Sequence, residues 1–191
     1  IEEIVASNPG SVVVIDEAYA DFWGNTAIPL TAKYDNLIVV RTYSKSRFLA
    51  GARLGYCVAD AELIADIERA RFGFNPYNVN SLTLAAGEQA LAENEYYTSK
   101  WNELTDTRNW SQEQLSRLGF ERTDSKTNFV FASHPRLSGE YLCSQLRERG
   151  FLVRRLGRGR IAEWLRITVG TRGDMRQLID AISEIIAKQE V

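Results

Sequence analysis

Cysteine and histidine are scarce in this chain, which has two cysteines and one histidine among 191 residues. Cys57 and Cys143 stand far apart without a CxxC pair, and His134 is the single imidazole, so neither a disulfide scaffold nor a structural zinc site is expected. The longest apolar runs, residues 12–15 and 37–40, are far below the roughly 20 residues that cross a bilayer. The first residues show no secretory-signal pattern. We therefore expect a protein of the reducing cytoplasm.

Neither sign of charge dominates the sequence. Lysine and arginine number 23 against 25 acidic residues, a net charge of -2, so no overall field attracts nucleic acid or an anionic membrane. Apolar residues make up 45% and charged residues 25%, as is ordinary for a globular protein. At about 150 residues per domain, the length allows one to one-and-a-half domains. Nucleic acid and membranes are therefore not expected as partners.

The hydrophobic pattern predicts an α/β protein. Two runs rich in β-branched residues, 11–15 and 36–42, read as strands, and residues 54–59 as a shorter third. Because these runs are continuously apolar, we expect a sheet that is covered on both faces. Asp60 is the predicted N-cap of a helix that runs to about residue 72.

The remainder predicts a long helical joint followed by a second lobe. The helical stretch spans residues 81–118, with a bend or break near 92–95, and Gly119 ends it. The second lobe combines predicted strands with two capped helices. Its elements are a strand at 128–132, a helix after Ser138, strands at 151–154 and 164–169, and a last helix that starts at a Thr171–Asp174 capping box.

Polar residues follow the first predicted strand. Asp16 and Glu17 come directly after the apolar run, and Tyr19 follows, at the strand end where α/β sheets place their ligands. A carboxylate there can hold a cationic ring nitrogen, and the phenol can hydrogen-bond the same ligand. An N-cap or turn acid is the simpler alternative.

The second predicted strand ends in Ser44 and Lys45. A partly desolvated lysine near another cation can act as an amine nucleophile toward a carbonyl, although a surface lysine in a polar turn is the alternative. The Ser44 hydroxyl and the Arg53 guanidinium suit a phosphate. Gly51 and Gly55 flank the arginine and predict close approach of the backbone around it.

Arg166 lies inside the otherwise apolar strand 164–169. An arginine is costly to bury without a partner. It therefore either pairs with a carboxylate of the protein or points into a cleft and binds an anionic substrate, and the sequence pattern leaves both open.

Together these features resemble the fold-type I pyridoxal-phosphate enzymes, specifically the class I and II aminotransferases, and among them most closely the histidinol-phosphate aminotransferases. The resemblance rests on an ordered set of segments: VVVIDEAYADF, NLIVVRTYSKSRFLAGARLGY, PYNVNSL, KTNFVFA and RERGFLVRRLGRGRIAEWLRITVGT. It implies the C-terminal half of the large, mainly parallel-sheet domain with a linker helix over residues 1–105, and the small C-terminal α/β domain over 106–191.

The resemblance also implies roles around pyridoxal 5'-phosphate. Lys45 would bind the cofactor covalently and carry the proton between substrate and cofactor. Asp16 would pair with the protonated pyridine nitrogen, and Tyr19 would hydrogen-bond the phenolic oxygen. Ser44 and Arg53 would hold the phosphate.

Two further arginines are implied to bind the substrate. Arg166 would take its anionic group, and Arg154 would be a second phosphate contact, although the adjacent Arg155 leaves the register open. The implied reaction is amino transfer between histidinol phosphate and imidazole-acetol phosphate with glutamate and 2-oxoglutarate, in histidine biosynthesis, by a homodimer. A threonine-phosphate decarboxylase, an aromatic aminotransferase and a catalytically silent fragment are the alternatives.

The chain also departs from the family pattern. Full subunits of the family are about twice as long, and the phosphate-cradling loop, the ring-stacking aromatic and a cofactor-binding Asn have no counterpart before Asp16. We therefore expect the C-terminal portion of such an enzyme, inactive in isolation. Arg47, in the lysine loop, is bulkier than expected there.

Overall fold

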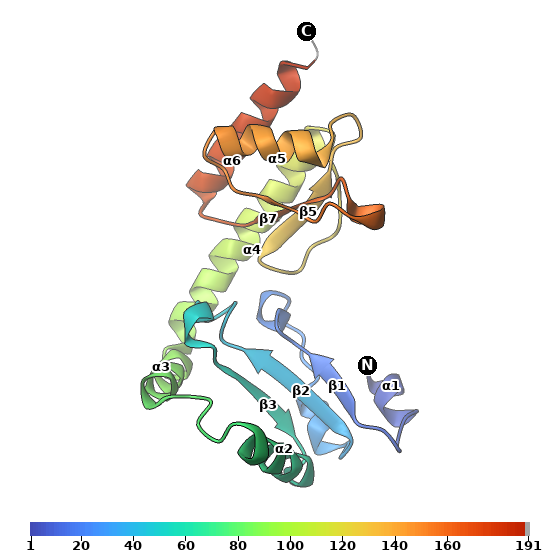
Figure 1. Cartoon of the computed structure of the whole chain (residues 1–191), viewed down its shortest axis with the longest axis vertical. Coiled ribbons are helices and arrows are strands. Elements are labelled where there is room, and N and C mark those ends of the chain that lie inside the picture. Colours follow the sequence, from blue (N-terminus) through green and yellow to red (C-terminus); the bar gives the residue numbers. More distant parts are fainter. Residues whose placement is uncertain (190–191) are drawn as a thin grey trace. The chain divides into compact units, whose positions relative to one another are not determined.

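The computed structural model describes residues 1–189 and divides the chain into two compact units, residues 1–99 and residues from 100 onward (Figure 1). The division falls inside helix α4 (Asn94–Arg117), as does the boundary at residues 105/106 that the sequence predicts. Each unit has its own core, so each is described by itself. No described helix is both long and apolar enough to span a membrane.

The first unit is built on a three-stranded sheet in the order β1 (Val13–Asp16), β2 (Leu37–Thr42) and β3 (Gly55–Ala59). The three predicted strands are thus confirmed. β1 and β2 are parallel, whereas β2 and β3 are antiparallel, so the sheet is mixed. The carboxyl ends of β1 and β2 and the start of β3 consequently lie at one end of the sheet (Figure 1).

The two faces of this sheet are covered unequally in the described chain. Leu37 and Val39 are fully buried on one face, packed against Val5 of the unpredicted helix α1 (Glu2–Ala6). On the other face Ile38 is buried at 9% exposure, whereas Val14 is 57% and Val40 36% exposed. The prediction of two covered faces is therefore only partly confirmed, because a run of valines presents the same apolar surface on both sides and does not show how completely each side is packed.

One helix of the first unit begins at its predicted cap. Asp60 accepts a hydrogen bond from the Glu62 amide at the start of α2 (Ala61–Phe74), as predicted. The long helical stretch breaks after α3 (Ser81–Ala92), inside the predicted interval. A Cβ at Gly87 of α3 would overlap the Leu54 side chain, so this helix packs closely on the residue that precedes β3.

The second unit has a four-stranded antiparallel sheet in the order β4-β5-β7-β6, with α4, α5 and α6 contributing to its core. Its elements are β4 (Glu121–Arg122), β5 (Phe129–Ser133), α5 (Gly139–Glu148), β6 (Arg154–Arg155), β7 (Leu165–Thr168) and α6 (Arg172–Ala187). The Ser138 cap and the Thr171–Asp174 capping box are confirmed. β4 was not predicted.

One predicted strand of the second unit is largely wrong. Of residues 151–154 only Arg154 pairs in the sheet, because Arg154 and Arg155 alone form β6 opposite β7. Leu152 is 81% exposed, so this apolar residue does not mark a strand face.

Candidate active site

Asp16, the last residue of β1, is exposed at the carboxyl end of that strand, where α/β sheets place their ligands. Its Oδ1 accepts a hydrogen bond from the Ala18 amide at 2.9 Å, and no other hydrogen bond to this carboxylate occurs within residues 1–189. The hydrogen bond from Ala18 makes Asp16 a turn acid, which agrees with the simpler of the two interpretations of its sequence position. The remaining acceptor capacity still permits a ligand.

Lys45 follows β2 at the same end of the sheet, and its amine lies over a neighbouring aromatic ring. Its Nζ is 5.8 Å from the centroid of the Tyr19 ring, within cation–π range. Because Tyr19 follows β1 and Lys45 follows β2, the parallel pairing of those strands brings the two loops together. The Lys45 amine and the Tyr19 ring, which the sequence predicts to bind the same ligand, therefore lie close together.

Ser44 and Arg53 flank the end of the β2–β3 ladder. The ladder ends at the Thr42–Gly55 pair, and just beyond it the Tyr43 amide donates to the Leu54 carbonyl at 3.0 Å. Arg53 has a φ of +55°, which is unusual for a residue with a Cβ. Its exposed guanidinium donates from Nη1 to the Ala50 carbonyl at 2.9 Å, leaving its other N–H groups directed at a ligand or at solvent.

The two glycines that flank Arg53 differ in their surroundings. A Cβ at Gly55 would lie 2.8 Å from the Arg41 carbonyl oxygen, whereas a Cβ at Gly51 would meet nothing within 4 Å. The predicted close approach of the backbone is therefore confirmed at Gly55 and wrong at Gly51, which lies in an exposed turn.

A buried charge pair below the strand ends was not predicted. Glu17 is 8% exposed, and its carboxylate accepts hydrogen bonds from Arg41 Nε at 2.8 Å and from the Thr26 hydroxyl at 2.8 Å. The Ala27 amide donates to the same carboxylate. An arginine inside the apolar run 36–42 could have predicted this pair, by the reasoning applied to Arg166.

The same arginine connects the charge pair to the lysine loop. Arg41 Nη1 donates to Asp21 Oδ1 at 2.5 Å, and the Ser46 hydroxyl donates to Asp21 Oδ2 at 2.5 Å. Glu17, Arg41, Asp21 and Ser46 thus form one network, called here the acid–arginine network, and it ends at the residue next to Lys45.

Arg47, whose size was unexpected, fastens the other side of the lysine loop. It donates to the Ala90 carbonyl at 2.8 Å and to Asn94 Oδ1 at 2.7 Å, and its guanidinium lies 5.1 Å from the Tyr97 ring centroid. An arginine that bonds the last carbonyls of a helix is electrostatically favourable. The long side chain is thereby accommodated.

Tyr43 lies between the strand end and the helices. Burial, with a smaller effect from neighbouring Tyr56, raises the pKa of the Tyr43 phenol. The phenol therefore stays neutral at physiological pH, and the structure makes it a packing residue of the loop, in edge contact with Tyr56.

In the second unit, Arg154 and Arg166 are paired across β6 and β7. The Arg166 guanidinium lies 5.0 Å from the Phe129 ring centroid, and its Nε is buried without a hydrogen-bond partner. Within residues 1–189 neither arginine forms an ion pair. Two adjacent cations without a counterion repel each other, so the arrangement favours an anionic ligand over the alternative of a protein carboxylate.

Arg155 has contacts of a different kind. Its Nε donates to the Ala162 carbonyl at 2.9 Å, and its Nη1 bonds Glu140 at 3.3 Å. Because neighbouring residues of a strand point to opposite faces, Arg154 and not Arg155 shares the face of Arg166.

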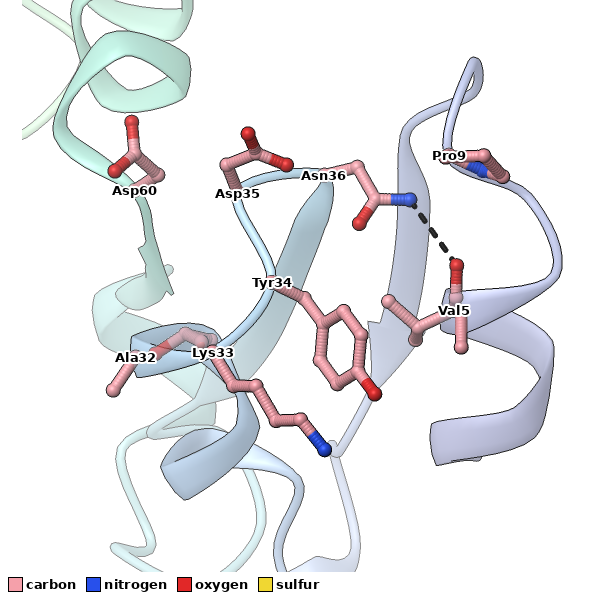
Figure 2. Close-up of a pocket in the computed structure, with 10 residues that line it drawn as sticks. Val5, Pro9, Ala32, Lys33, Tyr34, Asp35, Asn36 and Asp60 are labelled. Atoms are coloured by element: carbon pink, nitrogen blue, oxygen red, sulfur yellow. Dashed lines mark hydrogen bonds between the residues drawn. The ribbon is translucent and has the colours of Figure 1, made fainter.

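A cavity of about 350 Å³ lies at the opposite end of the first sheet, near the start of β2 (Figure 2). The polar groups around it hold the N-terminal helix. Asn36 bonds the Val5 carbonyl (Figure 2), and Lys33 pairs with Glu2, whose pKa is lowered chiefly by that hydrogen bond. No predicted cofactor residue lines this cavity.

The donor set at the strand ends suits pyridoxal phosphate. It combines an amine, an exposed carboxylate, a phenol, a hydroxyl and a guanidinium, which match an aldehyde, a ring nitrogen, a phenolic oxygen and a phosphate. The residues present therefore fit this group.

The chain is similar to known proteins over nearly its whole length. The model of the family "Aminotransferase class I and II" matches residues 1–182. Histidinol-phosphate aminotransferase of Lactococcus lactis subsp. lactis is 44% identical over 190 residues, which are 100% of this chain and 53% of that protein. The chain thus spans about half the length of the curated relatives it matches.

Solved structures have the same fold. Histidinol-phosphate aminotransferase from Sinorhizobium meliloti, in complex with pyridoxal-5'-phosphate, superposes with a TM-score of 0.83 and 25% identity, over 98% of this chain and 53% of that one. L-threonine-O-3-phosphate decarboxylase from Porphyromonas gingivalis also superposes with a TM-score of 0.83, at 22% identity, over 97% of this chain and 58% of that one. At this identity the similarity shows the fold alone. With the family model matching nearly its whole length, this chain belongs to the class I and II aminotransferases.

Proposed function

We propose that this chain carries the lysine-bearing part of a pyridoxal-phosphate aminotransferase that acts on a phosphate-bearing substrate. The observation that carries the proposal is the approach of the Lys45 amine to the Tyr19 ring at the sheet end that also presents Asp16. Bound pyridoxal phosphate supplies an aldehyde for the amine and a ring that accepts electrons.

Each residue at the strand ends has a separate proposed role toward the cofactor. Lys45 holds the cofactor covalently and moves a proton at its Nζ. The Asp16 carboxylate keeps the ring nitrogen protonated, because an anion beside a basic nitrogen favours its charged form. Tyr19 donates its hydroxyl to the phenolic oxygen, and Ser44 and Arg53 bind the phosphate.

Arg154 and Arg166 are proposed to bind the substrate's phosphate. Their cross-strand pairing without an ion pair supports a dianion as ligand. We infer amino transfer between histidinol phosphate and imidazole-acetol phosphate, with glutamate and 2-oxoglutarate as the second pair, in histidine biosynthesis. The names of the curated relatives support this choice.

A decarboxylase that acts on an amino-acid phosphate is the second candidate. The P. gingivalis enzyme has the same fold, and the same cofactor-binding residues can serve either reaction. The two differ in which bond to the substrate Cα breaks.

Because the relatives are about twice as long, we propose complete turnover for a protein of their length that contains this chain, and cofactor binding without turnover for the chain alone.

A homodimer is proposed from the apolar surface around the PYNVN loop, where Phe74, Tyr77 and Leu82 are 93%, 91% and 82% exposed. The free thiols of Cys57 and Cys143 are compatible with the cytoplasm.

Two product assays test the proposal. In a protein of the relatives' length that contains this chain, we expect 2-oxoglutarate to form from L-glutamate and imidazole-acetol phosphate. Carbon dioxide release from an amino-acid phosphate would instead assign the decarboxylase, and neither product would contradict the proposed reaction.

A further inference from the structure

The residue that follows Lys45 is held by a charged side chain from another loop. Ser46 is 1% exposed, and its hydroxyl donates to Asp21 Oδ2 at 2.5 Å. Asp21 belongs to the loop that also carries Tyr19, the ring under the Lys45 amine. The Ser46–Asp21 bond therefore joins the two loops beside the amine.

The carboxylate of Asp21 is itself fixed to the sheet. Arg41 of β2 bonds Asp21 and Glu17 together, and the side chains of Arg41 and Glu17 are 12% and 6% exposed. Every member of the acid–arginine network has a charged or hydroxyl partner, as a buried network requires if it is to be rigid. A cavity of about 10 Å³ beside Asp21 and Arg41 is about the size of one water molecule, and the Asp21 side chain is 21% exposed, so the carboxylate is partly shielded from solvent.

The lysine loop needs such support because its backbone is strained. Phe48 and Arg53 have φ angles of +56° and +55°, and non-glycine residues persist in this region only where their surroundings hold them. Arg47 fastens one side of the loop to α3, and Ser46 fastens the other side to Asp21.

We propose that Asp21 and Ser46 are positioning residues for Lys45, and that the acid–arginine network sets where the amine stands over Tyr19. The role of Lys45 as the cofactor-binding amine rests on the proposed function. The placement of the amine by the network does not, and it can be measured without any cofactor.

The test compares two buried serines, one next to Lys45 and the other in α4 of the second unit. Ser46→Ala removes the hydroxyl beside Lys45, whereas Ser111→Ala removes an equally buried hydroxyl that donates to the Thr107 carbonyl at 2.7 Å within α4. Ser46→Thr keeps the hydroxyl, and Asp21→Asn is a second disruption that leaves Ser46 in place. Thermal unfolding of every variant shows that it is folded.

The first measurement is trace labelling with acetic anhydride, read by peptide mass spectrometry as Lys45 relative to Lys33 and Lys126. Without the bond to Asp21, the Lys45 amine leaves the Tyr19 ring and reacts faster, by about threefold to tenfold, the change expected for one hydrogen bond. We expect this rise in Ser46→Ala and Asp21→Asn. Ser111→Ala leaves the ratio unchanged, and Ser46→Thr restores it.

The second measurement is borohydride trapping of pyridoxal phosphate at Lys45, which should fall in the variants whose acetylation rises. A rise in Lys45 acetylation together with a fall in trapping indicates that the amine is displaced. General loosening of the structure would instead also raise the acetylation of Lys33 and Lys126. Unchanged Lys45 acetylation in folded Ser46→Ala and Asp21→Asn overturns the inference. Absence of trapping in the unmodified chain overturns the proposed cofactor role alone, because acetylation still decides the positioning.

Discussion

At the scale of single residues, Asp16 is the group whose removal should affect cofactor affinity most selectively. Asp16→Asn keeps the shape and the Ala18 contact but loses the charge that would pair with the ring nitrogen. A hydrogen bond to a charged group contributes about 1.5–3 kcal/mol, so we expect affinity for pyridoxal phosphate to fall by roughly tenfold to a hundredfold. Absorbance titration with pyridoxal phosphate measures this affinity. Asp35→Asn, at the opposite end of the sheet, is the control, and equal effects of the two changes would refute the assignment.

Arg166 gives a second prediction at this scale, for the anion site of the other unit. Inorganic phosphate should raise the unfolding temperature of the chain, because a ligand that binds only the folded state stabilises it. Arg166→Ala should remove most of that rise. Arg155→Ala should keep the rise while lowering the unfolding temperature itself, since Arg155 bonds Ala162 and Glu140. A phosphate response that is unchanged by Arg166→Ala and lost in Arg53→Ala would exclude this site, because Ser44 and Arg53 are the other proposed phosphate ligands.

At the scale of elements, the β2–β3 pairing ends at Thr42 and Gly55, two residues from Ser44 and Arg53, and Gly55 lies close to the backbone of β2 there. Gly55→Ala would force a Cβ to within 2.8 Å of the Arg41 carbonyl, and overpacking of this kind costs about 1–3 kcal/mol. Gly51→Ala is the matched control, because nothing lies within 4 Å of its Cβ position. Denaturant unfolding measures the stability of both variants. Equal unfolding midpoints for Gly55→Ala and Gly51→Ala would contradict the close approach at Gly55.

The capping box of α6 predicts a pH dependence. Hydrogen bonds from the Thr171 side chain and amide lower the pKa of Asp174 below its ordinary value of 3.8. A lowered pKa stabilises the folded state at pH above 3.8, and this contribution is lost as the pH falls through the folded-state pKa. Asp174→Asn should therefore unfold more easily than the original chain at neutral pH, and the difference should shrink below about pH 4. A difference independent of pH would exclude this role for the carboxylate.

At the scale of the whole molecule, local signals predicted most of the elements and the strand-end grouping. The β-branched runs predicted β1 and β2, and the rule that ligands bind at the carboxyl ends of strands placed Asp16 and Lys45 at one end. How completely each face of the sheet is covered could not be predicted, because Val14 and Val39 are equally apolar although one is exposed and the other buried. Partners distant in sequence were missed for a similar reason.

The Asp21–Ser46 bond illustrates that limit. It joins residues 25 positions apart, and neither residue has a local pattern that marks it as a partner of the other. Arg41 did carry a usable signal, since a cation within an apolar strand requires an anion nearby. For Arg154, only the register of β6 against β7 could separate it from Arg155, and two-residue strands have too little sequence to fix a register.

Borohydride reduction of the chain in the presence of pyridoxal phosphate, followed by peptide mass spectrometry, tests the central claim most directly. The account predicts a phosphopyridoxyl group on Lys45 well in excess of Lys33 and Lys126, diminished by Asp16→Asn and unchanged by Asp35→Asn. Equal modification of the lysines, or modification that spares Lys45, would contradict it.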